Sequence, residues 1–327
     1  MLAALDQAVI PVLQHSESRH YQALHGDRFP ESDLFPLGPL VEYLQEHPRG
    51  QPPRVAFLGD SRVWGYLLEP DESIPAAFQR LTPDVQVLNL GINRFRAGSS
   101  FLVSKQLLDS VECFYLFFHD DPQQQQADPL LPTLIPVDPE DAARFGLRLP
   151  SRPQRWFDDI GRRWRLARYS YRLQAAWFGT STRQFCYLTL RRLMAHHSLT
   201  RHATAVHGSD ASSAAAAVYR IPMQAGPLPP DAQQRLAQRY PFLWRYAELL
   251  AHHRVHGFFI ELAQADSAMP EEDAALVNAQ FRPYVAVVRL AVPTAWLMDD
   301  HKHVTAEGAA GIARSLAQMT HAYQAEH

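Results

Sequence analysis

Short apolar runs that alternate with helix-compatible stretches constrain the fold of this chain more than any other feature of its sequence. These runs span residues 55–58, 85–90, 113–118 and 258–262. They are largely apolar in the manner of strands that helices cover on both faces. Strands and helices that alternate at this spacing predict a parallel sheet with right-handed crossovers. The loops at the carboxyl edge of that sheet are then the expected place for a functional site.

Helix-like stretches lie between these runs and after the last of them. The predicted helices span residues 73–81, 99–111, 232–253, 271–289 and 305–323. Ser99 or Ser100 is the predicted cap of the second helix, and Thr305 caps the last one. Pro283 is expected to kink or break the fourth helix, because proline lacks the amide hydrogen that a helix interior uses.

Composition divides the 327 residues into a core and two less regular parts. Residues 1–53 are punctuated by prolines and are expected to wrap the domain rather than fold alone. Residues 54–121 and 258–327 carry the alternating pattern and form the predicted core. Residues 122–257 begin with a glutamine run and a proline-rich stretch, and we interpret them as a mainly helical insertion. Within the insertion, helices are predicted over 157–178 and 182–197 and a mobile loop over 204–217.

The overall composition sets bounds on the class of protein. Apolar residues make up 46% of the chain and charged residues 20%, which permits a substantial buried core. A formal net charge of -3 gives no case for nucleic-acid binding. Asp6 and Pro11 argue against a signal peptide, and no apolar run is long enough to span a membrane. The compartment stays open between the cytoplasm and, if the chain begins after a removed anchor, an extracytoplasmic location.

Two polar motifs mark the predicted site. Gly59-Asp60-Ser61 follows the first apolar run, which would hold the serine hydroxyl on a sharp turn beside helix amides. Near the other end, Asp300 stands three residues before His303. Within one turn the carboxylate would bond one imidazole nitrogen and leave the other to face the serine, as a general base needs. The three side chains would supply an acyl-transfer triad.

These motifs resemble the SGNH, or GDSL-type, superfamily of serine esterases and acyltransferases. Residues 59–65 resemble the first block of that superfamily, residues 89–93 resemble the second, and residues 300–303 resemble the last. The resemblance extends over about 54–121 and 258–317. It implies a flavodoxin-like parallel sheet sandwiched by helices, with the blocks meeting at one edge.

The resemblance also implies roles for single residues. Ser61 would be the nucleophile, His303 the base and Asp300 the carboxylate that orients it. The backbone amides of Ser61 and Gly91 would form part of the oxyanion hole. No cofactor and no metal are implied. Asp60 is expected to fix the turn under the nucleophile through side-chain to backbone hydrogen bonds.

The third block departs from the pattern of the superfamily. Asp120 stands where the family has an asparagine that donates a hydrogen bond to the oxyanion. An ionised carboxylate donates nothing, and losing one such donor costs about a hundred- to a thousand-fold in rate. Burial could keep Asp120 protonated so that it donates, or His119 could donate instead. We therefore expect a weakened or specialised oxyanion hole, with His119 and Asn93 as further substrate contacts; Asn93 also fits a plain turn.

Together these features predict a serine esterase or O-acyltransferase that acts on an ester, with O-acetyl groups of a carbohydrate as the preferred substrate. The preference for sugar esters rests only on the blocks around Ser61 and Gly91 and on residues 69–73 between them. They resemble bacterial members associated with cell-surface polysaccharides. Membrane-associated or polysaccharide-biosynthesis proteins are the partners that this resemblance suggests.

Two alternatives stay open at this stage. A non-catalytic domain of the same fold could bind a glycan or scaffold an assembly, with Asp120 as a sign of lost activity. A metal-dependent hydrolase could use imidazole and carboxylate ligands. The residues available for such a metal site are Asp120, Asp299, Asp300, His301 and His303.

Two residue sets in the insertion also have an ordinary and a functional interpretation. Arginines stand at positions 155, 162, 163, 165, 168 and 172, and tryptophans at 156, 164, 177 and 244. The arginines form either a solvated helix face or a surface for an anionic polymer, a membrane or a partner protein. The tryptophans either fill a core or stack on sugar rings.

Overall fold

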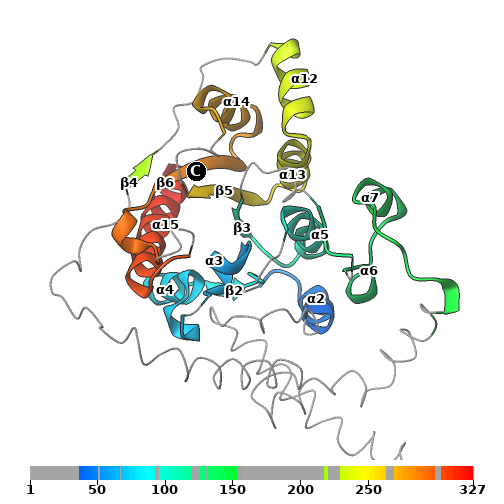
Figure 1. Ribbon diagram of the computed structural model, residues 1–327, viewed down its shortest axis with the longest axis horizontal. Coiled ribbons are helices and arrows are strands. Elements are labelled where there is room, and N and C mark those ends of the chain that lie inside the picture. Colours follow the sequence, from blue (N-terminus) through cyan, green and yellow to red (C-terminus); the bar gives the residue numbers. More distant parts are fainter. Residues whose placement is uncertain are drawn as a thin grey trace, which may run out of the picture.

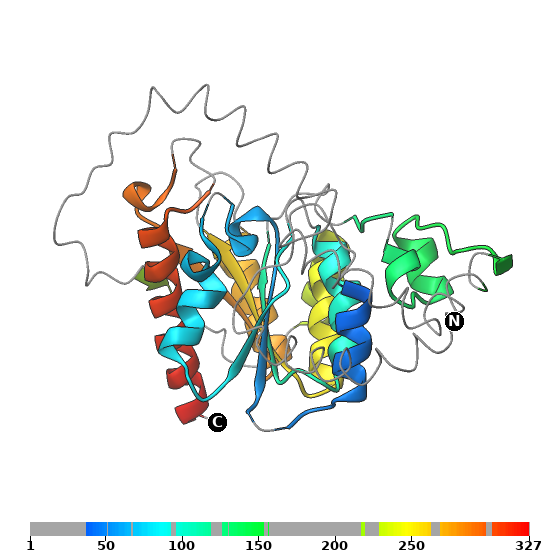
Figure 2. The same cartoon turned by 90° about the horizontal axis from the view of Figure 1, so that it is seen from below.

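The protein has an α/β fold in which helices cover both faces of a mainly parallel sheet (Figures 1 and 2). The computed structural model describes residues 37–50, 52–66, 68–92, 96–118, 126–129, 131–153, 156, 217–219, 229–262, 269–298 and 303–326. The sheet is built from β1 (Arg54–Leu58), β2 (Gln86–Asn89), β3 (Cys113–Phe117), β4 (Ala217–Tyr219), β5 (His256–Leu262) and β6 (Val285–Ala291). The predicted parallel sheet is therefore confirmed.

The order of the six strands is β2-β1-β3-β5-β6-β4. The first five run parallel, and β4 pairs antiparallel with β6 at the edge. Apart from β4, this is the 2-1-3-4-5 order of flavodoxin-like sheets. In such an order the chain leaves β1 toward β2 and then returns to β3 on the other side. The carboxyl ends of β1 and β3 thus flank the switch point where ligands bind in this class.

Two helix layers enclose the sheet, as Figure 2 shows most clearly. One layer holds α4 (Ile74–Leu81) and α15 (Ala306–Glu326), and the other holds α2 (Leu37–Glu46), α5 (Ala97–Leu107), α13 (Pro241–His252) and α14 (Glu271–Phe281). The remaining helices are α3 (Ser61–Trp64), η1 (Pro70–Glu72), α6 (Leu131–Leu134), α7 (Pro139–Arg144), α12 (Pro230–Arg239) and η3 (Thr294–Trp296). Figure 1 places α6 and α7 outside α5, away from the sheet.

Alternate residues of each strand enter the two cores. In β1, Val55 and Phe57 pack into the core under α4 and α15, whereas Ala56 and Leu58 pack into the core on the opposite face. The last three of these side chains are fully buried. Because both faces are covered, apolar residues occupy every position rather than every second one. This explains why the strands appear in the sequence as continuous apolar runs.

Parts of the predicted leader and insertion belong to these layers. Leu40 and Leu44 of α2 are buried in the same core as α5, although α2 falls within residues 1–53. Leu250 of α13 and the whole of β4 fall within residues 122–257, and α13 packs against β5 and β6. These segments therefore help to build the sheet domain, while α6, α7 and α12 agree with a helical character for the rest of the described insertion.

Two predicted helices were wrong in part. The helix expected over 232–253 is two helices, α12 and α13, because Pro241 cannot continue a helix but is well suited to its first turn. The helix expected over 271–289 ends at Phe281, and β6 follows from Val285. The apolar run in β6 contains three valines, and its burial beside β5 favours the strand.

Of the predicted helix caps, Thr305 is confirmed, and Ser99 and Ser100 are wrong. Thr305 caps α15 as expected, since its Oγ1 accepts a hydrogen bond from the Gly308 amide at 3.1 Å. Neither Ser99 nor Ser100 caps α5, which begins at Ala97. The hydroxyl of Ser99 instead accepts a hydrogen bond from the Asp128 amide at 2.7 Å. A tertiary contact thus uses the group that local sequence assigned to a cap.

The structure tests the core interpretation for two of the four tryptophans, Trp244 and Trp156. Trp244 is 7% exposed and packs edge-on against Phe281 at 4.8 Å between ring centroids, which confirms a core role. Trp156 is 60% exposed, so the core interpretation is wrong for this residue. The described residues do not include Trp164, Trp177, the six arginines named above, the predicted helices over 157–178 and 182–197, or positions 204–216 of the predicted loop. The last position of that loop, Ala217, begins β4. None of the described helices combines the length and apolar character needed to span a membrane.

Candidate active site

The turn after β1 delivers Ser61 to the carboxyl edge of the sheet. The chain leaves β1 through Gly59, whose φ of 157° few other residues adopt. A Cβ atom on Gly59 would lie 2.8 Å from Cγ2 of Val63 and 3.1 Å from Cβ of Phe117. Ser61 then begins α3. The absence of a side chain at Gly59 therefore lets α3 settle directly against the end of β3.

Asp60 stabilises the first turn of α3. Its Oδ1 accepts a hydrogen bond from the Arg62 amide at 3.1 Å, which is an N-cap. The same carboxylate forms a forked ion pair with the Arg62 guanidinium, with Nε at 3.0 Å and Nη2 at 3.2 Å. Arg62 is only 5% exposed. The predicted structural role of Asp60 is confirmed, and the ion pair with the Arg62 side chain adds two further contacts to the same carboxylate.

Ser61 and His303 meet at this edge. The distance from Ser61 Oγ to His303 Nε2 is 2.8 Å, which is a hydrogen bond between side chains from opposite ends of the chain. Both residues are half-buried, so the pair is shielded but open to solvent on part of its surface. The two predicted partners are therefore brought together in the geometry that a serine nucleophile and its base require.

Backbone hydrogen bonds join the two ends of the loop that carries His303. The Met298 amide donates a hydrogen bond to the His303 carbonyl at 2.8 Å, and Leu297 forms a β-bridge with Val304. The Thr305 amide donates to the Trp296 carbonyl, also at 2.8 Å. These bonds hold the two ends of the loop together, so the backbone position of His303 depends on where Trp296, Leu297 and Met298 lie.

Trp296 packs this end of the loop against α15. It is 4% exposed and lies over two glycines of the helix. A Cβ atom on Gly308 would approach the Trp296 carbonyl oxygen to 2.4 Å, and one on Gly311 would approach the indole ring to 2.1 Å. Only glycine lets the indole lie this close to the helix. The contact between Trp296 and α15 therefore helps to fix the position of the loop that carries His303.

Gly91 is placed beside α3, at the end of β2. A Cβ atom there would lie 2.5 Å from the backbone nitrogen of Trp64. The Gly91 amide donates a hydrogen bond to Oδ1 of Asn89 at 3.0 Å, and the Ile92 amide donates to the Gly59 carbonyl at 3.1 Å. In this structure the Gly91 amide is thus used by the side chain of Asn89. Its role in an oxyanion hole stays a prediction, and it would require this amide to donate to the oxyanion as well as to Asn89 or instead of it.

The Gly91→Ala substitution is expected to lower the free energy of unfolding by about 1–3 kcal/mol. The added methyl group would meet backbone atoms of α3, which cannot rotate away as a side chain can. Denaturant unfolding followed by fluorescence measures the change. Gly50→Ala is the matched control, because the nearest atom to its Cβ would be the Pro48 carbonyl oxygen at 3.8 Å. Equal stabilities for the two variants would contradict the packing described for Gly91.

Several predicted site residues lie outside the described part of the chain. These are Asp300, Asp120, His119 and Asn93, together with Asp299 and His301 of the alternative metal site. Their roles stay predictions. Among the described residues, no group of three or more His, Cys, Asp or Glu side chains is placed to hold a metal ion.

Tyr66 is a neighbour of His303 that the sequence did not indicate. Its ring lies 4.4 Å from the His303 imidazole between centroids, with the two planes inclined at 33°. The resemblance in the first block ends at Gly65, one residue earlier. A tyrosine directly after that block was the available signal, but only the folded chain shows which side chain it contacts.

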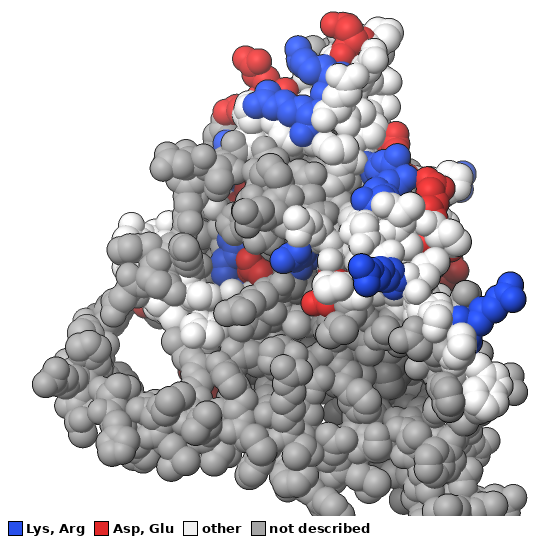
Figure 3. All heavy atoms as spheres, turned by 45° about the vertical axis from the view of Figure 1, so that its right-hand side comes forward, with Lys and Arg blue, Asp and Glu red and all other residues white. Residues whose placement is uncertain are grey.

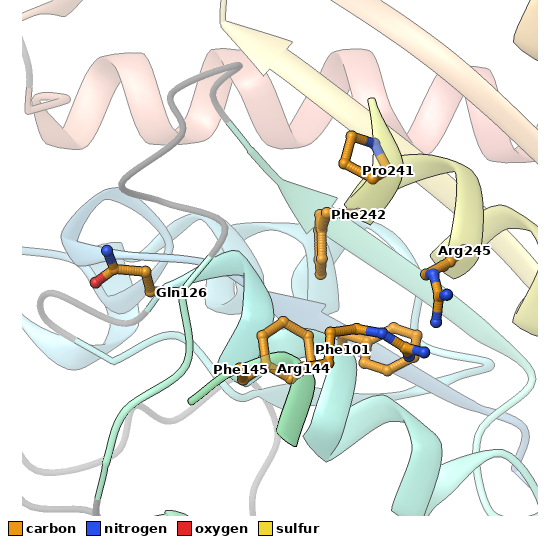
Figure 4. A pocket seen from close by; sticks show the side chains of 7 residues that line it. All are labelled: Phe101, Gln126, Arg144, Phe145, Pro241, Phe242 and Arg245. Atoms are coloured by element: carbon orange, nitrogen blue, oxygen red, sulfur yellow. The ribbon is translucent and has the colours of Figure 1, made fainter. Parts of the chain in front are cut away.

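A separate cavity of about 410 Å³ lies between α5, α7 and the start of α13 (Figure 4). Phe101, Phe145 and Phe242 form its apolar wall, and neither Ser61 nor His303 lines it. Arg144, which also lines the cavity, is paired with Glu140 at 2.7 Å and with Asp141 at 3.2 Å. The remaining lining residues are Gln126, Pro241 and Arg245, so the cavity has a mixed lining and lies apart from the serine and histidine.

Charges on the described surface are mixed in sign. In Figure 3 the Lys and Arg side chains lie among Asp and Glu side chains rather than in one patch of a single sign. Among the described residues, Lys105 pairs with both Asp138 and Asp141. On the face shown, the described charges thus form no large patch of a single sign.

Comparison with known proteins adds no assignment to this geometry. No protein-family model matches the chain, and no curated protein sequence matches it. A functional assignment therefore depends on the motifs of the sequence and on the contacts among Ser61, His303 and their neighbours.

Proposed function

We propose that this protein is a serine esterase or O-acyltransferase of the SGNH type, with Ser61 as nucleophile and His303 as general base. The observation that carries the proposal is the 2.8 Å hydrogen bond between Ser61 Oγ and His303 Nε2. A serine hydroxyl is a weak nucleophile at neutral pH and needs an adjacent base to accept its proton. His303 stands at the distance from which a neutral imidazole can do so.

The chemistry follows from these two groups. Ser61 Oγ attacks the acyl carbon while His303 Nε2 takes the hydroxyl proton, and the carbonyl oxygen becomes an oxyanion. When the intermediate collapses, His303 returns that proton to the departing alkoxide, which leaves as an alcohol. His303 then deprotonates water in an esterase, or a sugar hydroxyl in a transferase. The attack of that oxygen breaks the acyl-enzyme bond, and the proton returns to Ser61.

The first turn of α3 supplies an amide for the oxyanion. Amides in the first turn of a helix have no acceptor within that helix. The Arg62 amide is used by Asp60, whereas the Ser61 amide belongs to the nucleophile itself. Backbone amides at this position stabilise the charge that develops on the carbonyl oxygen. We therefore assign the Ser61 amide to the oxyanion hole.

Three placements support the SGNH type within the general α/β fold. Ser61 follows β1, Gly91 follows β2, and His303 precedes the last helix, α15. The three positions lie on carboxyl-edge connections of a sheet with flavodoxin-like strand order. This is the arrangement that the resemblance implies for its conserved blocks, and Asp300 is proposed as the third member of the triad.

For the substrate we propose an O-acetyl ester of a carbohydrate. This part rests on the resemblance of the blocks around Ser61 and Gly91 to bacterial proteins associated with cell-surface polysaccharides. Proteins of a polysaccharide-assembly system are the corresponding proposed partners. No cofactor takes part in the proposed steps.

Fluorophosphonate labelling tests the proposal directly. A fluorophosphonate probe is expected to add to Ser61, with fluoride as the leaving group, and peptide mass spectrometry would locate the adduct. Ser61→Ala should abolish labelling, whereas Ser151→Ala, which changes an exposed serine after α7, should leave it intact. Failure of the native protein to react would refute the serine mechanism, and chelator-sensitive hydrolysis that survives Ser61→Ala would favour a metal-dependent one.

One sequence feature favours a second candidate, a non-catalytic domain of the same fold that binds a glycan or scaffolds an assembly. Asp120 in the third block replaces a hydrogen-bond donor with a group that, when ionised, repels the oxyanion. A protein of this kind would bind acetylated oligosaccharide in isothermal titration calorimetry but would remain unlabelled by the fluorophosphonate.

The Asp120→Asn substitution separates a weakened active site from a normal one. An asparagine side chain can donate one hydrogen bond to the oxyanion, and a net gain of about 1.4 kcal/mol corresponds to about a tenfold higher kcat. Hydrolysis of a chromogenic acetyl ester measures this rate. An unchanged or lower rate would show that Asp120 is not a deficient oxyanion donor.

A further inference from the structure

The imidazole of His303 is contacted by two residues of one short segment. Ser61 Oγ meets the edge of the ring at Nε2, at 2.8 Å, and the Tyr66 ring lies over the imidazole at 4.4 Å between centroids. An inclination of 33° and this separation bring one ring face toward the other. The nucleophile and an aromatic surface therefore reach the base from the same turn.

The backbone holds Tyr66 in register with the nucleophile. The amides of Gly65 and Tyr66 both donate to the Ser61 carbonyl, at 3.1 Å and 2.9 Å. Gly65 has a φ of 87°, which ends α3 in a left-handed turn. The turn brings Tyr66 back beside the start of the helix, and the residue that provides the hydroxyl also fixes the tyrosine through its carbonyl group.

The two contacts restrain different motions of the imidazole. The hydrogen bond with Ser61 restrains the position of Nε2 but does not by itself set the tilt of the ring about the line from Nε2 to Oγ. An aromatic ring against the face of the imidazole restrains that tilt. The same face would lie next to the positive charge that His303 acquires when it takes the serine proton, and aromatic faces attract cations.

We propose that Tyr66 is a positioning residue that holds the imidazole plane of His303 in line for proton transfer from Ser61. The inference rests on the proposed function, because proton transfer matters only if Ser61 is a nucleophile. Tyr66 does not exchange a proton in this role; its aromatic ring is the part that acts. A phenyl ring should therefore replace it, whereas an aliphatic side chain of similar size should not.

The test compares Tyr66→Phe with Tyr66→Leu. Tyr66→Phe should keep the rate of fluorophosphonate labelling and the kcat for an acetyl ester within about twofold of the native protein, since the ring is retained. Tyr66→Leu should lower both by about tenfold, the equivalent of one aromatic contact, while KM and the thermal midpoint stay close to native values. A native rate for Tyr66→Leu would overturn the inference, as would a loss for Tyr66→Phe equal to that for Tyr66→Leu.

Nuclear magnetic resonance tests the contact without catalysis. The carbon-bound protons of the His303 ring should show nuclear Overhauser effects to the Tyr66 ring, and their shifts should change in Tyr66→Leu but not in Tyr66→Phe. The native-protein measurement decides the contact even if Tyr66→Leu does not fold. Absence of labelling in the native protein would refute the proposed function, whereas normal labelling without a Tyr66 effect would refute the positioning role alone.

Discussion

Replacing His303 with glutamine is expected to slow ester turnover by about 10⁴-fold or more. Glutamine retains a polar side chain but has no basic nitrogen to take the proton from Ser61 Oγ, which now lies 2.8 Å from His303 Nε2. Ser61→Ala should cause a loss of similar size, because the base has no use without its nucleophile. The measurement is kcat/KM for a chromogenic acetyl ester.

The double variant gives the sharper result. Members of a catalytic unit are strongly non-additive, so Ser61→Ala combined with His303→Gln should lose little more than either single change. His253→Gln is the matched control, since this histidine is exposed at the end of α13. Losses that multiply would mean that the two residues act independently, and a native rate for His303→Gln would exclude it as the base.

The second large effect concerns stability. Asp60→Ala is expected to lower the free energy of unfolding by about 3 kcal/mol, because it leaves the buried Arg62 guanidinium without its carboxylate and removes the N-cap of α3. Asp60→Asn should lose less, since an amide oxygen can still accept the Arg62 amide hydrogen bond. Equilibrium unfolding in guanidinium chloride measures both.

Two further variants show whether the buried charge is the cause. Asp60→Ala combined with Arg62→Leu should regain much of the lost stability, because no unpaired charge remains inside. Glu140→Ala breaks the pair with Arg144, in which the glutamate is 83% exposed, and should cost less than about 1 kcal/mol. A loss for Asp60→Ala as small as that for Glu140→Ala would contradict the account of α3.

The sequence predicted the parts of the fold that depend on local pattern. Strands β1, β2, β3 and β5 follow the apolar runs closely, because burial on both faces leaves a continuous apolar signature. β6 was missed because its run also fits a helix when the covering layers are unknown. Tertiary contacts likewise redirected Ser99 from a helix cap to a loop amide.

The candidate site shows the same division. The convergence of Ser61 and His303 was predictable, since residues at the carboxyl ends of parallel strands and before the last helix share one edge. The contact of Tyr66 with His303 and the fit of Trp296 over Gly308 and Gly311 were not. Each depends on shapes that meet only after distant segments pack, and neither leaves a periodic or compositional trace.

The attachment of the His303 loop to α15 has a consequence for folding. The turn with Ser61 belongs to an early part of the chain, whereas the imidazole takes its place only when the last helix docks through Trp296. If His303 activates Ser61 as proposed, a partly folded chain would carry an unactivated serine. Labelling of Ser61 by the probe would then show that the last helix has docked, and misfolded protein would remain unlabelled.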